Sequence, residues 1–176
     1  MTEPLPVFPY HPDAVNYGVV KQKAITCSAC GKARDWAYTG PFRSADAPEP
    51  LNLCPWCVAD GNAAQKYGGT FQEADFEEFV TPASLQAVLR RTPGFPTMNP
   101  IFWPGHHGEC CIFLGDFIPE EQPELLEQAS VREELGRIAR EVGLAEDNLH
   151  YSNNSLYILL FQCSTCHSYR LSTDFS

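Results

Sequence analysis

The stretch that decides the fold begins with Cys27-Ser28-Ala29-Cys30 and ends, after an interval of 23 residues, with Cys54-Pro55-Trp56-Cys57. In a C-x-x-C sequence, a tight turn points both thiolates to the same side, and two such pairs match the tetrahedral preference of Zn²⁺. Residues 32–41, which lie between the pairs, are typical of a strand and a turn that bring the chain back. The spacing therefore predicts a four-thiolate zinc site made of Cys27, Cys30, Cys54 and Cys57.

A third C-x-x-C pair lies near the end of the chain, between two predicted strands. Residues 155–162 are apolar, aromatic and β-branched, and Cys163-Ser164-Thr165-Cys166 supplies the turn. Residues 167–172 then read as the returning strand of a hairpin. Because this pair provides only two ligands, it needs two more donors to complete a zinc site.

The missing donors are expected from the segment His106-His107-Gly108-Glu109-Cys110-Cys111, which offers imidazoles and thiols around a glycine turn. We prefer His107 with Cys111, because they are four residues apart and can converge on the Cys163–Cys166 turn. The second site would then have three thiolates and one imidazole. His106 is interpreted as a hydrogen-bonded polar residue, although it is the alternative ligand. The cofactor expected from all the spacings is Zn²⁺, with two ions per chain.

Composition restricts the class of protein further. The chain has 176 residues, with 22 acidic against 12 basic side chains and a net charge of −10, which argues against nucleic-acid binding. The longest apolar run, Leu156–Phe161, is far shorter than the roughly 20 residues of a membrane helix. The N-terminus lacks the basic and apolar regions of a secretory signal, so a cytoplasmic location is expected. Thiols stay reduced there, and eight cysteines favour metal binding over disulfides.

The predicted organisation is α+β: two zinc-knuckle or zinc-ribbon β modules with short helices packed between them. Four prolines in residues 1–20 favour an extended N-terminal arm, followed by a first zinc module over residues 21–70. Residues 71–176 are expected to form the second module, a helical segment followed by the zinc-knuckle hairpin, and the whole chain is expected to form one compact domain. Thr81 and Pro82 should begin one helix.

A second helix is predicted from the pattern that starts at Ser130. Ser130-Val131-Arg132-Glu133 has the form of a capping box, and apolar residues recur at helical spacing up to Val142. Glu133 and Arg137 are expected to form an ion pair on the solvent side.

The same motifs are compatible with three other functions. Cys54-Pro55-Trp56-Cys57 resembles a thioredoxin-like redox pair, but no βαβ pattern precedes it. His107-Gly108-Glu109 followed by Cys163 and Cys166 loosely resembles a zinc deaminase, in which Glu109 would move protons. A nucleic-acid-binding ribbon has the spacing but not the charge.

Several further stretches are distinctive and spread over nearly the whole chain. They are Phe8-Pro9-Tyr10-His11-Pro12-Asp13, Tyr38-Thr39-Gly40-Pro41-Phe42, Leu53 to Gly61, Arg91-Thr92-Pro93-Gly94-Phe95, Phe161 to Cys166, and Tyr169-Arg170-Leu171. Together they resemble the bacterial CbrC family, which is named for a colicin tolerance protein. The resemblance implies a bacterial, cytoplasmic, zinc-containing protein associated with toxin tolerance.

The resemblance also bears on the second site. The family pattern around Trp103 reads Trp-x-x-His-Cys-x-Asp-x-Cys-x-Phe, which places His106 on the family histidine, His107 on its first cysteine and Cys111 on its second. This implies a cysteine-to-histidine exchange at position 107. Glu109 takes the place of the family aspartate, and Cys110 has no counterpart.

The function expected from these observations is a non-catalytic zinc protein whose acidic surface engages a basic partner. A DNA-cleaving toxin must be basic to hold DNA, so an acidic scaffold would associate with it rapidly and with strong salt dependence. The partner is therefore predicted to be a basic protein such as a toxin, and neither nucleic acid nor membrane is expected.

Overall fold

The computed structural model describes residues 3–143 and 156–175. Contacts divide the chain into two units, and each unit takes two separate pieces of sequence. Unit 1 comprises Met1–Glu73 and Thr81–Pro96, and unit 2 comprises Ala74–Val80 and Thr97–Ser176. The described elements are mixed helices and small sheets, which confirms the predicted α+β class. Unit 1 therefore includes residues 81–96, whereas the sequence predicts these residues to be part of the second module.

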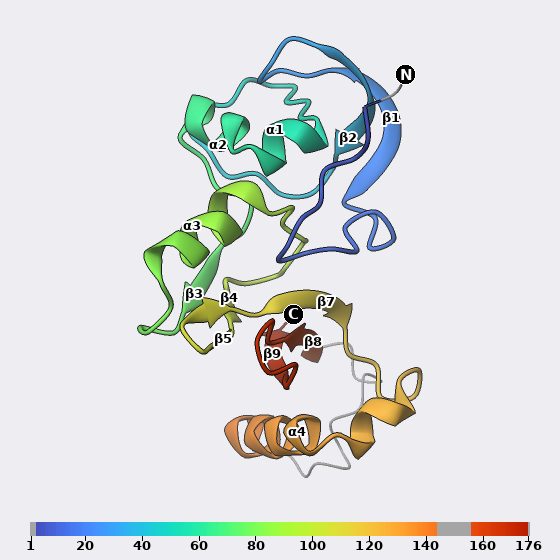
Figure 1. Cartoon of the computed structure of the whole chain (residues 1–176), viewed down its shortest axis with the longest axis vertical. Helices are drawn as coiled ribbons and strands as arrows, with labels where there is room; N and C mark the ends of the chain where they lie inside the picture. The colour runs from blue at the N-terminus through green and yellow to red at the C-terminus, as the bar shows by residue number, and fades with distance from the viewer. Residues whose placement is uncertain (1–2, 144–155, 176) are drawn as a thin grey trace. The chain divides into compact units, whose positions relative to one another are not determined.

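Unit 1 is built on an antiparallel hairpin and three helices (Figure 1). Strands β1 (Val20–Thr26) and β2 (Ala33–Tyr38) pair with a register shift between Gln22 and Ile25. Three helices follow: α1 (Pro55–Ala59), α2 (Asn62–Tyr67) and α3 (Pro82–Arg91). The start of α3 is confirmed, because Pro82 takes the first turn and the Thr81 side chain accepts a hydrogen bond from Ser84 N at 3.3 Å.

The N-terminal segment is more deeply built into unit 1 than the extended arm predicted for residues 1–20. Turns occupy residues 12–18, and Phe8, His11 and Ala14 are buried. The imidazole of His11 lies 2.7 Å from the carbonyl oxygen of Pro93 through Nδ1. It also packs edge-on against Tyr17 and Phe95. The prolines therefore shape turns that place apolar side chains in the core.

The burial of His11 predicts a pH dependence of stability. Burial lowers the pKa of His11 below its ordinary value, although the Pro93 carbonyl and Asp13 partly oppose this. The unfolded chain therefore takes up a proton near pH 6.5 that the folded chain resists, so stability is lost as pH falls below about 6.5. Urea unfolding at a series of pH values below about 7 should show that the free energy of unfolding falls less steeply with pH in His11→Gln than in the unmodified protein. Equal slopes in the two proteins would contradict the prediction.

The described part of unit 2 contains three small sheets. Strand β3 (Ala74–Phe76) pairs in parallel with β4 (Ile101–Trp103), and β5 (Gly105–His106) forms a short hairpin with β6 (Glu109–Cys110). The largest sheet has the order β7-β8-β9 and is antiparallel, with β7 at Ile112–Asp116, β8 at Leu156–Gln162 and β9 at Tyr169–Phe175. This sheet contains the hairpin predicted around the third cysteine pair.

A 3₁₀ helix, η1 (Pro123–Glu127), and the helix α4 (Ala129–Val142) complete unit 2, and α4 packs against the sheet near β9. Their apolar contact forms a buried core. Its fully buried members include Phe117, Val131, Ile138, Ile158 and Leu171. The stripe of apolar residues read from the sequence is thus the packing face of α4, which positions β9 and the turn before it.

Two sequence predictions about α4 are wrong. Ser130 does not cap the helix: Gln128 is the N-cap, without a side-chain cap, and Ser130 Oγ accepts a hydrogen bond from Tyr169 N at 3.1 Å. Arg137 pairs with Glu134 and Glu141 at 2.8 Å each rather than with Glu133. Strand β9 contributes to both differences, because its backbone N–H groups bind the Ser130 and Glu134 side chains and its Leu171 carbonyl accepts a hydrogen bond from Arg137.

Within residues 3–143 and 156–175, no helix combines the length and apolar character that crossing a membrane requires.

Candidate metal centres

The first cysteine group is assembled within unit 1 from the hairpin and the first helix. Cys27 and Cys30 follow the end of β1, Cys54 is the N-cap of α1, and Cys57 lies inside that helix. The four Sγ atoms all lie within 4.8 Å of one another. The structure therefore brings together the four thiols that the spacing of the two C-x-x-C pairs predicted.

Backbone hydrogen bonds fix the turn that holds Cys27 and Cys30. Cys27 N donates to Lys32 O at 2.9 Å, and Gly31 N donates to Cys27 O at 2.7 Å. Gly31 has a φ of 73°, a left-handed conformation that glycine adopts without strain. Cys54 N then donates to Cys27 Sγ at 3.4 Å, which links the second pair to the first.

Helix α2 clamps the same turn through two side chains. Lys66 Nζ donates to the carbonyl oxygens of Ser28 and Ala29 at 2.8 and 2.9 Å, and Tyr67 Oη donates to Ser28 O at 2.7 Å. The ammonium group also brings positive charge beside the cysteines. A four-thiolate site that holds one divalent ion carries a net charge of −2, so this position is electrostatically favourable.

The thiols of the first group interact strongly. A hydrogen bond from Cys54 holds the pKa of Cys27 well below its ordinary range, and the same bond raises the pKa of Cys54. Burial raises the pKa of Cys57 to about 12. Four thiolates this close repel one another in a buried site, and a divalent cation is the group that relieves the repulsion. The donor set thus fits a thiophilic metal.

The second group lies within unit 2 and contains His106, His107, Cys163 and Cys166. Their donor atoms also lie within 4.8 Å of one another, and Cys166 Sγ is 3.3 Å from His106 Nδ1. The structure brings together His107, Cys163 and Cys166, as the sequence suggested. It differs at the fourth position, where His106 stands in the group and Cys111 does not.

Cys111 is held beside this group by two hydrogen bonds of its backbone. Its backbone N donates to Pro104 O at 2.9 Å, and its carbonyl accepts a bond of 2.9 Å from Trp103 Nε1. The thiol is fully buried, and burial together with the neighbouring thiols Cys163 and Cys166 raises its pKa to about 12. Cys111 therefore lies near the second group, but its sulfur is not among the four donor atoms that lie within 4.8 Å of one another.

A tight turn presents the two histidines. His106 and Glu109 face each other across β5 and β6, so His107-Gly108 is the two-residue loop of the hairpin. Both loop residues have positive φ, 54° at His107 and 80° at Gly108, which is the pattern of a type I′ turn. Asparagine or glycine usually occupies the first loop position, and here a histidine adopts the left-handed backbone conformation. Glu109 lies beside the group on the second strand.

The turn at Cys163–Cys166 repeats the turn at Cys27–Cys30. Cys163 N donates to Ser168 O and His167 N donates to Cys163 O, both at 3.0 Å, at the same intervals as in the first knuckle. His167 occupies the position of Gly31 and has a φ of 58°. The two knuckles therefore share one backbone design, but the second carries a side chain where the first has glycine.

This difference predicts that His167→Gly stabilises the protein. The left-handed conformation destabilises the folded state by about 1–2 kcal/mol in a residue with a Cβ atom, and glycine removes this penalty. Glycine also gives the unfolded chain more conformational entropy, which offsets about 0.4–1 kcal/mol of the gain. The free energy of unfolding should thus rise by up to about 1.6 kcal/mol in urea titrations. His167→Ala keeps the Cβ and should show no gain. A gain of equal size in the alanine variant would show that the strain is not the cause.

The two groups differ in exposure. Three of the four cysteines in the first group are buried and Cys30 is partly buried, whereas His107 and Cys166 in the second are exposed. Around Cys166, the Ser168 hydroxyl lies 3.1 Å from the sulfur, and this hydrogen bond lowers the pKa of the thiol to about 5. Cys163 Sγ accepts a hydrogen bond from Thr165 N at 3.3 Å. The second group therefore faces solvent on one side.

The chain is an α+β protein with two groups of four cysteine and histidine donors that are compatible with metal binding. It belongs to the family described as "Uncharacterised protein family (UPF0167)", whose model matches residues 5–175. It is 37% identical over 150 residues to UPF0167 protein PA1536 of Pseudomonas aeruginosa, covering 83% of this chain and 75% of the relative. It is 40% identical over 129 residues to UPF0167 protein Mb2317 of Mycobacterium bovis, covering 69% of this chain and 65% of the relative. No solved structure matches the chain.

Proposed function

We propose that this protein binds two zinc ions without catalysing a reaction, and that it acts as an acidic scaffold for a protein partner. The observation that carries the proposal is the convergence of four cysteine or histidine donors within 4.8 Å at two places. Thiolate and imidazole are the donors that zinc prefers in tetrahedral protein sites. Reduced thiols in a cytoplasmic protein would be available for this binding.

A structural role follows from the number of donors. Structural zinc sites have four protein ligands, whereas catalytic sites leave one position for water or substrate. Each group offers four, so the alternative of a zinc-dependent, deaminase-like enzyme that uses Glu109 would require one ligand of the second group to leave. A redox function of Cys54 and Cys57 would compete with their place beside Cys27 and Cys30.

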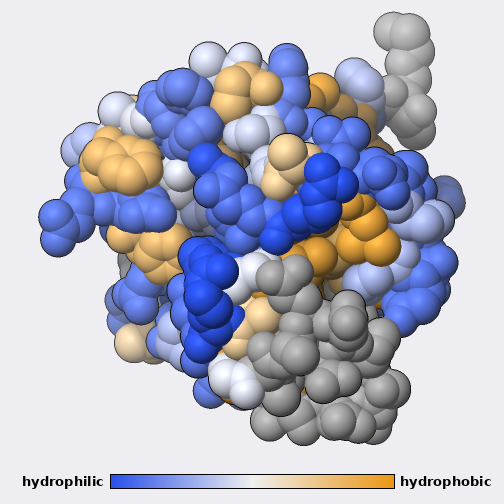
Figure 2. Space-filling view, turned by 90° about the horizontal axis from the view of Figure 1, so that it is seen from below, coloured by the Kyte–Doolittle hydropathy of each residue, from blue (hydrophilic) through white to orange (hydrophobic). Residues whose placement is uncertain are grey.

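The proposed partner is a basic protein, and the resemblance to the CbrC family points to a toxin of the colicin class. The net charge of −10 would attract such a protein over long distances, and zinc bound by four thiolates would add negative charge. One face of the molecule carries mostly hydrophilic side chains, with hydrophobic ones in separate groups (Figure 2). An association driven by net charge would weaken as salt is added.

Metal analysis of protein purified without added zinc tests the metal sites. We expect two zinc ions per chain, and X-ray absorption should show four nitrogen and sulfur ligands at each. His106→Ala and Cys163→Ser should each retain one zinc ion, because each removes a donor of the second group. Cys111→Ser should retain two. If Cys111→Ser loses zinc and His106→Ala does not, the ligand set predicted from the sequence is correct and the set in the structure is not.

Titration with a basic DNA-cleaving toxin tests the partner. We expect a complex at low salt whose dissociation constant rises steeply with ionic strength, because the association is electrostatic. An acidic protein of similar size and charge is the matched control for non-specific attraction. Absence of a complex at low salt, or equal binding by the control, would overturn the scaffold proposal and leave the zinc sites unaffected.

A further inference from the structure

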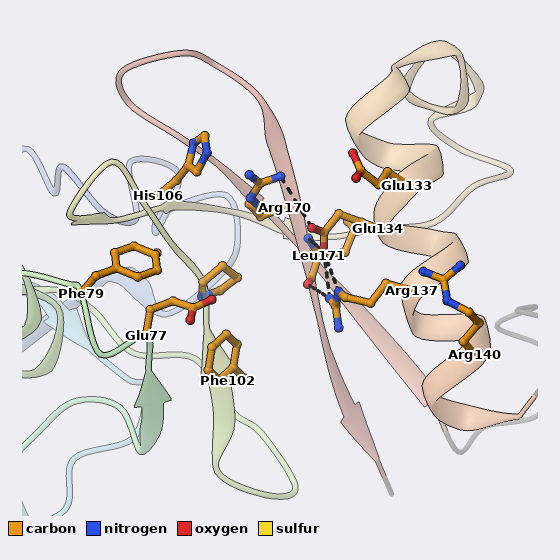
Figure 3. A pocket seen from close by; sticks show the side chains of 12 residues that line it. Glu77, Phe79, Phe102, His106, Glu133, Glu134, Arg137, Arg140, Arg170 and Leu171 are labelled. Carbon is orange, nitrogen blue, oxygen red and sulfur yellow. Dashed lines mark hydrogen bonds and ion pairs between the residues drawn. The ribbon is translucent and has the colours of Figure 1, made fainter.

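Unit 2 contains a pocket of about 510 Å³ that neither metal group explains. One wall comes from residues 77–79 and β4, and the opposite wall comes from α4 and β9 (Figure 3). His106 lies at its edge. The volume falls within the range of about 300–1,000 Å³ that holds small ligands.

The first wall combines aromatic rings with a carboxylate. The side chains of Phe79 and Phe102 are large and apolar, yet they are 56% and 43% exposed. Glu77 lies on the same wall (Figure 3), and its carboxylate makes neither a hydrogen bond nor an ion pair within the described residues. Aromatic faces and a carboxylate are the groups that bind an ammonium ion, through cation–π attraction and a charged hydrogen bond.

The second wall carries the carboxylates of Glu133 and Glu134 and three arginines, and the arginines are in two different states. Arg137 is fully engaged, because it binds Glu134, Glu141 and the carbonyl oxygen of Leu171 at 2.8–2.9 Å. Among the residues that the structure describes, Arg170 by contrast has only a 3.6 Å ion pair with Glu134 and a 3.5 Å contact with the Tyr169 carbonyl. The first arginine is therefore structural, and most donors of the second are available to a ligand.

Arg140 adds a second available cation to this wall. It lines the pocket and forms no hydrogen bond or ion pair with any residue that the structure describes. The pocket thus has a carboxylate between phenyl rings on one side, and on the other it has guanidinium donors together with Glu133 and the ion-paired Glu134. A guanidinium group binds a carboxylate in a bidentate manner, so the second wall is suited to an organic acid.

We propose that this pocket binds a free α-amino acid, with its carboxylate toward Arg170 and Arg140 and its ammonium group toward Glu77. A simple anion would leave Glu77 unpaired beside it, and a simple cation would face two arginines. A zwitterion satisfies both walls, and the rings of Phe79 and Phe102 can also contact its side chain. The assignment goes beyond the proposed scaffold and does not depend on it.

Calorimetric titration of the zinc-loaded protein with each of the twenty free L-amino acids tests the assignment. We expect at least one to bind in a 1:1 complex with a dissociation constant of about 1 mM or tighter. The N-acetyl and carboxamide derivatives of that amino acid should each bind at least about tenfold more weakly, since each lacks one charge.

Two variants locate the two ends of the ligand. Glu77→Gln should weaken binding of the free amino acid about tenfold but leave the affinity for its N-acetyl derivative unchanged. Arg170→Gln should also weaken binding of the free amino acid about tenfold but leave the affinity for its carboxamide unchanged. Glu78→Gln, an exposed neighbour outside the pocket, is the matched control and should bind normally. Circular dichroism and zinc content check that each variant is folded.

The proposal fails if none of the twenty amino acids shows binding at a ligand concentration of about ten times the expected dissociation constant. It also fails if an amino acid binds equally well to Glu77→Gln and Arg170→Gln. Binding of inorganic phosphate or a mononucleotide in an Arg170-dependent manner, without amino-acid binding, would assign the pocket to anions instead.

Discussion

Serine in place of Cys27 is expected to remove one of the two zinc ions and the fold of unit 1. A hydroxyl group is not a thiolate, so three donors would remain around an ion that requires four. Structural zinc supplies roughly 10–16 kcal/mol of apparent binding energy in small zinc-finger peptides, which is comparable to the whole stability of a domain. The turn of Cys27, the N-cap of α1 and the Lys66 clamp all depend on this one centre.

The measurement is the zinc content of the variant together with its yield in the soluble fraction. Cys110→Ser is the matched control, since Cys110 is a buried cysteine that belongs to neither group. It should lose some packing energy but keep two zinc ions. Soluble Cys27→Ser protein with two zinc ions would show that the first group is not a metal centre.

Gly94→Ala is expected to be the most damaging change outside the metal groups. A Cβ atom at position 94 would lie 1.7 Å from the carbonyl oxygen of Phe71 and 2.6 Å from its carbonyl carbon. These are backbone atoms, so no rotation of a side chain can relieve the overlap. Gly94 N also donates to Tyr38 Oη at 3.1 Å. We expect a loss of about 4 kcal/mol or more, which leaves little folded protein.

Gly18→Ala separates this overlap from ordinary backbone strain. Gly18 lies in the same unit with a φ of 88°, and the nearest atom to an added Cβ is Lys21 Cε at 3.7 Å. Its substitution should cost only about 1–2 kcal/mol. Thermal unfolding of the two variants measures the difference. Similar melting temperatures would show that the loop around Gly94 can move to accommodate a methyl group.

Sequence reasoning was most effective where one local pattern determines the structure. The spacing of the two C-x-x-C pairs predicted the four cysteines that the structure brings together, and Thr81-Pro82 predicted the start of α3. Both patterns act over a few residues through turns and caps. The α+β class followed from the same local patterns.

Predictions that depended on distant contacts were less successful. Ser130 has the sequence of a capping residue, but β9 supplies a backbone N–H that binds its hydroxyl instead. His106 lies in the second group because the type I′ turn at His107-Gly108 presents both imidazoles to the cysteines. The sequence alone does not reveal that a histidine adopts a positive φ. The pocket could not be predicted either, since its walls come from segments far apart in the chain.

The division of the chain into two interleaved units has a consequence for truncated fragments of the protein. Unit 1 needs Thr81–Pro96 as well as its first piece, and those residues follow a short stretch that belongs to unit 2. A fragment that ends at Glu73 would lack α3, whose Leu89 carbonyl binds Phe71 N at 2.8 Å, and it would lack the Pro93 partner of His11. No single truncation point separates the two units, because each unit includes two separate pieces of the chain. Recombination or truncation therefore preserves both units only when they are kept together.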